Sequence, residues 1–385
     1  MELKIKKRVL ILTEWYLPGR KAGGPVKSIE SLVWAMGEYF DFYILTTDSD
    51  LGEKLPYKEI MVNQWISQSD GSKVFYMRTK ELNIDYIQSS IQSIQYDFLY
   101  LNSLYSKWFS IIPLRLKMKN KIPGKIILAP RGMLSRGALR IKTLKKKSFI
   151  FFSRCTGLHR EVRWHATYPE ELKEIKENFG EKSDVIIAKN FSKPVLVVNS
   201  VISKKPGELR LFYLSRISKV KNLHIAIKSL TSLNYNEGNI IFDVYGSAED
   251  SQYLQDCKNL TKNLNKNITV NFLGSIENEK VGSLASEYHF LFLPTSNENF
   301  GHSIFESLQS GCPVIIGNNT PWKNLEHFGC GWDLDPQPEN LRDCLIQALK
   351  MDESEHSKMR KSAKKFVSLN FDIESVKREM RELFS

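Results

Sequence analysis

Two glutamates in one short stretch could bind a ligand that carries hydroxyl groups. Glu298 and Glu306 bracket the sequence Glu-Asn-Phe-Gly-His-Ser-Ile-Phe-Glu. If Glu298 lies in a loop and Glu306 on the helix that follows, they are at most roughly 12 Å apart along the axis. Carboxylates accept hydrogen bonds from vicinal hydroxyls. The pair could therefore hold both ends of a nucleotide-sugar. The alternative is an ordinary helix with one carboxylate near its start and one on a solvated face.

The residues between the two glutamates suit a phosphate. The apolar run 288–293 precedes them and the turn-strand unit 311–316 follows, so the pattern predicts a strand, a loop and a helix N-terminus. Amide groups at a helix N-terminus attract anions. We expect the backbone of Asn299, Phe300 and Gly301 to offer such amides.

A second loop carries cations. Arg216 and Lys221 follow the predicted strand 209–214 and precede a helix. Arg gives forked hydrogen bonds and Lys a mobile point charge, so the two could converge on a diphosphate. A merely solvated loop is the alternative.

The first half of the chain has its own candidate loops. Gly23 and Gly24 lie between the apolar run 8–13 and a helical pattern that begins near residue 26, and glycines let backbone approach a ligand closely. Arg131 follows the predicted strand 125–129 and is a candidate anion contact. Asp48 and Asp50 could hold a divalent metal, but an Asp-rich turn is the simpler interpretation.

Strands alternating with helices predict an α/β fold with two Rossmann-like domains. At 385 residues the chain is long enough for two cores. We expect one domain over 1–195, a second domain over 196–366, and a C-terminal helix over 367–385 that packs back on the first domain. Further strands are expected at 42–47, 73–78, 97–102, 164–167, 184–188, 240–245 and 268–273.

The net charge and the composition of the chain limit the kinds of partner that it could bind. The net charge of +12 favours an anion: a nucleotide diphosphate, a lipid diphosphate at a membrane, or nucleic acid. Cations and apolar residues alternate over 137–155, which predicts a basic amphipathic helix that could contact an anionic membrane, or else a solvated helix face. Five scattered cysteines indicate reduced thiols. No membrane-length apolar run and no signal peptide is evident, so we expect a cytoplasmic protein, and peripheral contact with the inner face of the membrane stays open.

An ordered set of motifs resembles glycosyltransferase family 4, a family of nucleotide-sugar-dependent enzymes with the GT-B architecture of two facing Rossmann-like domains. The motifs are Gly23-Gly24-Pro25, Pro130-Arg131-Gly132-Met133, Ser215-Arg216 to Lys221-Asn222, Tyr245-Gly246, Phe272-Leu273-Gly274, and Glu298 to Glu306 with Gly311-Cys312-Pro313-Val314. Thr320-Pro321-Trp322 with Gly329 to Trp332 also resembles a bacterial surface-polysaccharide branch of the family.

The resemblance implies a retaining transfer of a hexose or N-acetylhexosamine from a UDP- or GDP-linked donor, without a cofactor or metal. Glu298 would contact the sugar and Glu306 the ribose, while Arg216 and Lys221 would neutralise the diphosphate. The segment 299–301 would contact sugar and phosphate, Ile276 would face the base, and Gly23 and Gly24 would approach the donor. The domain over 1–195 would be the acceptor side, and the domain over 196–366 would bind the donor. The acceptor would be lipid-linked or an oligosaccharide, for capsule, lipopolysaccharide or a similar polymer.

Departures from the family leave some roles open. Many members carry a histidine where this chain has Asn102, so Asn102 and Arg131 are the acceptor-side candidates. His302 could touch the ligand or simply begin a helix. A nucleotide-sugar epimerase of similar architecture and a non-catalytic nucleic-acid-binding protein are the alternative functions. Because the basic residues are dispersed over both α/β halves, we expect no nucleic-acid partner.

Overall fold

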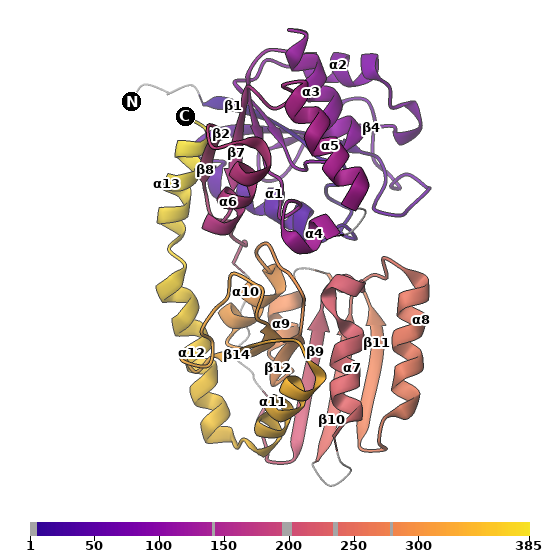
Figure 1. Ribbon diagram of the computed structural model, residues 1–385, viewed down its shortest axis with the longest axis vertical. Coiled ribbons are helices and arrows are strands. Elements are labelled where there is room, and N and C mark those ends of the chain that lie inside the picture. Colours follow the sequence, from indigo (N-terminus) through magenta and orange to yellow (C-terminus); the bar gives the residue numbers. More distant parts are fainter. Residues whose placement is uncertain (1–5, 141–142, 195–201, 234–237, 278–279) are drawn as a thin grey trace. The chain divides into compact units, whose positions relative to one another are not determined.

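The computed structural model describes residues 6–140, 143–194, 202–233, 238–277 and 280–385. The chain forms two compact units. Unit 1 contains residues 1–193 and 373–385, and unit 2 contains residues 194–372 (Figure 1). The expected boundary between residues 195 and 196 lies outside the described residues. The expected boundary after residue 366 falls inside a helix, and the division into units comes after Asp372.

Unit 1 is built on an eight-stranded sheet with the order β3-β4-β2-β1-β5-β6-β7-β8. Its strands are β1 (Lys7–Leu12), β2 (Phe40–Thr47), β3 (Trp65–Ser67), β4 (Lys73–Met77), β5 (Phe98–Leu101), β6 (Lys125–Leu128), β7 (Val162–Ala166) and β8 (Asp184–Ile187). Its α-helices are α1 (Gly24–Met36), α2 (Ile84–Gln92), α3 (Ile112–Met118), α4 (Arg136–Arg140), α5 (Thr143–Cys155), α6 (Pro169–Phe179) and α13 (Ile373–Leu383). All neighbouring strands are parallel except β3, which pairs antiparallel with β4.

Unit 2 contains a six-stranded parallel sheet with the order β11-β10-β9-β12-β13-β14. Its strands are β9 (Glu208–Leu214), β10 (Asn239–Tyr245), β11 (Ile268–Gly274), β12 (Phe290–Leu293), β13 (Val314–Gly317) and β14 (Gly331–Leu334). Its α-helices are α7 (Leu223–Thr231), α8 (Ser251–Leu260), α9 (Val281–Ala285), α10 (His302–Ser310), α11 (Pro338–Lys350) and α12 (Glu353–Asn370).

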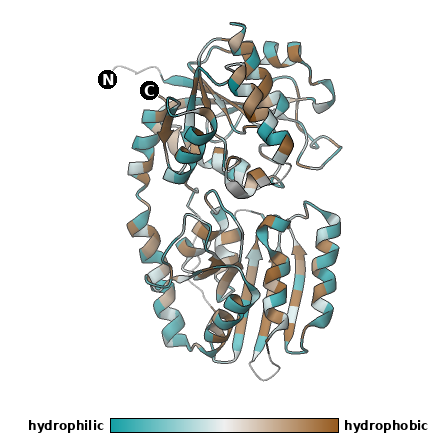
Figure 2. Ribbon diagram, in the orientation of Figure 1, coloured by the Kyte–Doolittle hydropathy of each residue, from teal (hydrophilic) through white to brown (hydrophobic). Residues whose placement is uncertain are grey.

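Hydrophobic burial explains both sheets. Every residue of β5, β12 and β13 is buried, as expected for central parallel strands covered on both faces by helices (Figure 2). Each unit has its own hydrophobic core. Burial of apolar surface contributes about 25 cal/mol per Å², so these strands supply much of the driving force for folding. The α/β class predicted from the sequence is confirmed.

The last helix belongs to unit 1 although it ends the chain. Phe384 lies just after α13, and its ring centroid is 5.1 Å from that of Phe40 and 5.6 Å from that of Phe98. The Lys377 ammonium pairs with Glu38 at 3.0 Å, and the Lys189 amide donates to Glu379 at 2.8 Å. These contacts fix the C-terminus against the first sheet.

Several expectations were wrong in detail. The edge strands β3 and β14 were not predicted, and the observed strands differ from the predicted ranges by up to two residues at an end. The helix expected over 137–155 is represented by α4 and α5, which cover 136–140 and 143–155, and residues 141–142 lie outside the described part. The five cysteines agree with the expected reduced thiols, because all are free, with Cys155 exposed and the other four buried.

Candidate functional site

The site in unit 2 lies where the strand order of the sheet reverses. Strand β9 comes first in this unit and has β10 on one side and β12 on the other. The connections after β9 and β12 therefore leave in opposite directions, which opens a crevice at the carboxyl ends of these strands. The cationic loop 215–222 follows β9, and the loop 294–301 follows β12.

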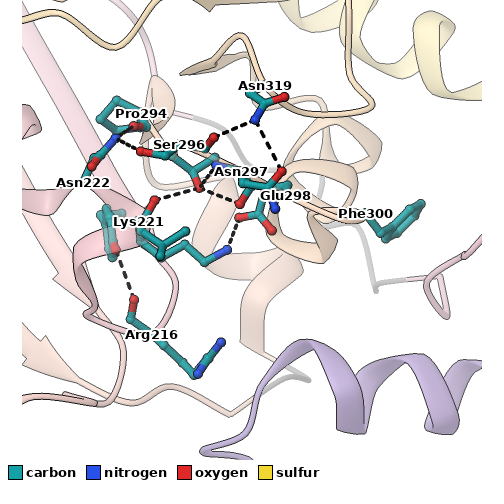
Figure 3. A network of polar contacts seen from close by, with 12 residues as sticks. Arg216, Lys221, Asn222, Pro294, Ser296, Asn297, Glu298, Phe300 and Asn319 are labelled. Atoms are coloured by element: carbon teal, nitrogen blue, oxygen red, sulfur yellow. Dashed lines mark hydrogen bonds and ion pairs between the residues drawn. The ribbon is translucent and has the colours of Figure 1, made fainter. Parts of the chain in front are cut away.

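Lys221 and Glu298 meet across this reversal point. The Lys221 Nζ lies 2.6 Å from Glu298 Oε1, and Figure 3 shows the two side chains directed at each other. Their side chains are only 13% and 12% exposed. Deleting one partner of a buried ion pair costs about 3–5 kcal/mol of stability, because the other charge is left unpaired. The fold thus brings together two predicted residues that are 77 positions apart in the sequence.

Asn222 links the same two loops. It has a left-handed backbone, with φ of 55°, at the start of α7. Its side-chain amide donates to the carbonyl oxygen of Pro294 at 2.9 Å and to Ser296 Oγ at 2.7 Å (Figure 3). The Ser296 amide in turn donates to the carbonyl oxygen of Val220 at 2.9 Å. These bonds fix the position of Lys221 relative to the loop that carries Glu298.

Arg216 has a different partner. Its guanidinium pairs with Glu249 at 3.0 Å, and the two side chains are 34% and 48% exposed. An ion pair this exposed contributes little to stability, so a ligand could replace Glu249 at small cost. The structure thus does not join Arg216 to the Lys221–Glu298 pair directly.

Phe300 and Gly301, just before α10, contribute no polar side chain to the site. The Phe300 ring is buried against the rings of His302, Phe305 and Trp322, and it points away from the polar network in Figure 3. Trp322 donates its indole N–H to the carbonyl oxygen of Phe300. Gly301 has φ of 79°, and a Cβ there would come within 2.8 Å of Ile304. Glycine is thus required at the entry to the helix.

The remaining donor-side candidates lie at the same edge of the sheet. Glu306 is in the second turn of α10 and is buried, with 4% exposure. Ile276 follows β11 and packs partly against the core. Gly246 follows β10, where a Cβ would come within 1.8 Å of the Ser215 carbonyl oxygen. Glycine at this position lets the loops after β9 and β10 approach each other closely.

In unit 1 a polar network joins the acceptor-side candidates. Arg131 donates through Nε to Asn102 Oδ1 at 2.8 Å and through its terminal nitrogens to Asn190 and Tyr100. Asn102 donates to the carbonyl oxygen of Pro25, next to Gly24, at 3.4 Å. Gly23 begins α1 with φ of 66°. The predicted residues of this half thus gather at the carboxyl edge of its sheet.

Aspartates 48 and 50 act as loop acceptors. Asp48 accepts from the amide and hydroxyl of Thr79, and Asp50 accepts from the amides of Arg20 and Lys21. These bonds agree with the Asp-rich turn. Within the described ranges, no group of three His, Cys, Asp or Glu residues is arranged to hold a metal.

Sequence reasoning assigned no role to three residues of these networks. Glu249 pairs with the predicted Arg216 and Asn190 accepts from the predicted Arg131, whereas Asn222 bonds Pro294 and Ser296. Only Asn222 had a signal, because asparagine just before a helix tolerates a left-handed backbone. Glu14 also went unnoticed. Burial raises the pKa of its carboxyl, which accepts from Ser106 across the strand reversal of unit 1 at 3.3 Å.

The family model described as "Glycosyl transferases group 1" matches residues 199–366. This range contains Arg216, Lys221, Ile276, Glu298 and Glu306, so all the donor-side candidates of unit 2 lie within the matched segment. The match agrees with the predicted glycosyltransferase class.

A curated relative aligns over part of the chain. The alpha-monoglucosyldiacylglycerol synthase of Streptococcus pneumoniae is 30% identical over 128 residues, which are 33% of this chain and 28% of the relative. The chain thus aligns with less than a third of that relative's length.

Solved structures resemble the whole chain. The sucrose-phosphate synthase of Thermosynechococcus elongatus has a TM-score of 0.71 at 13% identity, with 98% of each chain covered. Anabaena Alr3699/HepE in complex with UDP-glucose has a TM-score of 0.70 at 15% identity, covering 98% of this chain and 99% of the other. At these identities the likeness establishes the fold, which is that of the GT-B glycosyltransferases.

Proposed function

We propose that this protein is a glycosyltransferase that moves a sugar from a nucleoside-diphosphate donor to an acceptor hydroxyl. The observation that carries the proposal is the Lys221–Glu298 pair at the strand reversal of unit 2. It couples a cation suited to a diphosphate with a carboxylate suited to sugar hydroxyls, inside the segment that matches glycosyl transferases group 1.

The residues take the following roles in this proposal. Lys221 and Arg216 neutralise the diphosphate, Glu298 and the backbone of 299–301 hold the sugar, and Glu306 holds the ribose. The base lies near Ile276. Contacts with donor or acceptor stay predictions for Gly23, Gly24, Asn102 and Arg131. In the structure, the side-chain nitrogens of Arg131 bond Asn102, Asn190 and Tyr100 within unit 1.

The reaction breaks the bond between the anomeric carbon and the diphosphate oxygen, and the leaving diphosphate keeps the electron pair. Fixed positive charge where this negative charge develops lowers the barrier. Lys221 meets this requirement because Asn222 and the loop after β12 hold its position before the ligand arrives. The acceptor oxygen then bonds to the same carbon on the leaving-group face, and its proton passes to the departing phosphate. The configuration is thus retained.

A UDP-linked hexose is our first choice of donor. The structurally similar Alr3699/HepE was solved with UDP-glucose, and the Streptococcus pneumoniae relative is named for a glucosylated lipid. An N-acetylhexosamine and a GDP-linked donor are the alternatives to be screened.

A lipid-linked or oligosaccharide acceptor for capsule, lipopolysaccharide or a similar polymer fits the charge of the chain. Within α5, Leu144, Phe151 and Phe152 are 85%, 62% and 64% exposed, and Lys145 and Lys147 are exposed beside them. Exposed apolar groups flanked by cations suit an anionic membrane surface. Within the described ranges, no helix has the length and apolar character to cross a bilayer. We therefore propose peripheral contact through 137–155, at the cytoplasmic face.

A thermal-stability screen followed by a transfer assay tests the proposal. UDP-, GDP- and ADP-sugars are added to the wild type, and a ligand at 100 times its Kd stabilises by about 2.7 kcal/mol. Lys221→Gln should lose most of this shift. Lys228→Gln, an equal change of charge at an exposed position of α7, should keep it.

The positive ligand then serves as donor with membrane lipid extracts or oligosaccharides as acceptors. Labelled sugar in the acceptor fraction supports the proposal, and an epimerised free sugar nucleotide would favour an epimerase. If no sugar nucleotide stabilised the wild type, the proposal would fail.

A further inference from the structure

A cavity of about 540 Å³ lies at the amino edge of the unit 1 sheet, away from the carboxyl edge that carries the candidate residues. We call it the amino-edge cavity. Its lining comes from the end of α5, the turn before β7, the end of α6 and the start of β8. The residues that matter here are Arg154, His159, Arg160, Phe179, Lys182 and Asp184.

The cavity carries surplus positive charge. Its two carboxylates are already neutralised, since Asp184 pairs with Arg163 at 3.0 Å and Glu181 with Lys176 at 3.6 Å. Arg154, Arg160 and Lys182 form no ion pair with any residue that the structure describes. The α5 and α6 C-terminal ends each contribute roughly half a negative charge. About two positive charges therefore remain without a counter-charge.

His159 gives a second, independent sign of a missing partner. Its side chain is 92% buried, since its exposure is 8%, and its ring stacks on Trp164 at 5.2 Å. Neither ring nitrogen has a hydrogen-bond partner in the described structure. Buried polar atoms are nearly always bonded, so His159 leaves hydrogen-bonding capacity in the cavity lining that the described residues do not use.

The surplus positive charge suits an anion, and the surface beside the cavity indicates which class of anion it is. Arg154 follows Phe151 and Phe152 by less than one helical turn, and both phenylalanines are exposed. Leu144, Phe151 and Phe152 lie on one face of α5, because positions i, i+7 and i+8 share a face. An apolar stripe that ends within one turn of Arg154, a lining residue of the cationic cavity, matches a lipid, whose acyl chains lie beside its charged headgroup.

We propose that the amino-edge cavity binds the phosphate of an anionic membrane phospholipid. This site extends the membrane contact proposed above and is separate from the sugar-transfer site. Arg154, Arg160 and Lys182 supply charged donors to the phosphate oxygens, and Phe151 and Phe152 enter the apolar layer. The occupant orients unit 1 on the membrane and takes no part in the chemical step.

The test compares two double variants with the same loss of charge. Arg160→Gln with Lys182→Gln alters the cavity, and Lys54→Gln with Lys58→Gln alters exposed lysines after β2. Flotation with phosphatidylcholine vesicles is measured with and without phosphatidylglycerol. General attraction is worth about fivefold in binding for each cation near the surface, so the control double, which loses two cations, should lose about 25-fold at most. The cavity double should lose about tenfold more, because it also loses hydrogen bonds to the phosphate.

Further measurements distinguish a phospholipid headgroup from free phosphate as the ligand of the cavity. They also distinguish the cavity proposal from the sugar-transfer proposal. Phe151→Ser with Phe152→Ser should weaken flotation yet leave stabilisation by glycerol 3-phosphate intact. Equal losses in the two charge doubles would overturn the cavity. Stabilisation by inorganic phosphate without any preference for phosphatidylglycerol vesicles would overturn the lipid assignment. The cavity double should keep wild-type stabilisation by UDP-sugars, so failure of the sugar-transfer proposal would be seen separately.

Discussion

At the scale of single residues, the two glutamates of the opening motif have different environments. Glu298 is in a loop and pairs with Lys221, whereas Glu306 is buried within α10. A carboxylate that faces the reacting sugar affects the transition state, while one that anchors the ribose affects ground-state binding. The proposed roles therefore predict different kinetic defects.

We expect Glu298→Gln to lower kcat by about 100-fold with a small change in KM for the donor. Glu306→Gln should raise the donor Kd by about tenfold, since a hydrogen bond to a charged group is worth about 1.5–3 kcal/mol. Steady-state kinetics with calorimetric Kd values measure both. The reverse pattern would exchange the two roles.

The residue scale also limits what sequence could predict. The motif identified Glu298 and Lys221 separately, but their contact depends on two loops that only the strand order brings together. Partners such as Glu249 and Asn190 belong to no motif. Their role arises from tertiary placement, so spacing along the chain carries no signal for them.

At the scale of elements, Asn222 fixes the loop after β9 to the loop after β12, because it lies in the first loop and bonds Pro294 and Ser296 in the second. Asn222→Ala should cost about 1–3 kcal/mol of stability and weaken donor binding, since it removes two hydrogen bonds and disfavours the left-handed backbone. Asn222→Gly tolerates the backbone but lacks the bonds. Thermal unfolding and UDP affinity of both variants are the measurements.

Comparison of the two Asn222 variants separates the causes. If the glycine variant matched the wild type in UDP affinity, the side-chain bonds would not position Lys221. If both variants lost affinity to a similar degree, the bonds rather than the backbone angle would be responsible.

Element prediction succeeded for central strands and failed at the edges. Strands such as β12 are continuous apolar runs, which a buried parallel strand requires. The three-residue β3 is only partly buried and pairs on one side, so its sequence has no comparable signal. β14 is short and half-buried at its end. Its pairing depends on β13 rather than on local preference.

At the scale of the whole molecule, four buried histidines make stability depend on pH. Burial lowers the pKa of His159 and His356 to about 4 and of His165 and His289 to about 3. The unfolded chain binds these protons near pH 6.5, whereas the folded chain does not. The stability is therefore fully present above pH 6.5 and is lost as the pH falls toward 3–4.

Each pH unit in this window should cost about 1.4 kcal/mol per histidine. Thermal unfolding at pH values of about 7.5, 6.5 and 5.5 measures this loss of stability. His356→Gln should reduce the slope, and the exposed His327→Gln should leave it unchanged. Unchanged stability down to pH 5 would show that these rings are not held neutral.

The central claim is that Lys221 at the strand reversal of unit 2 binds the diphosphate of a nucleotide-sugar. Calorimetric titration of wild type, Lys221→Gln and Lys228→Gln with UDP and UMP tests it most directly. We expect the wild type and Lys228→Gln to prefer UDP, and Lys221→Gln to lose about tenfold of this preference. An unchanged UDP-to-UMP ratio in Lys221→Gln, or no UDP binding by the wild type, would contradict it.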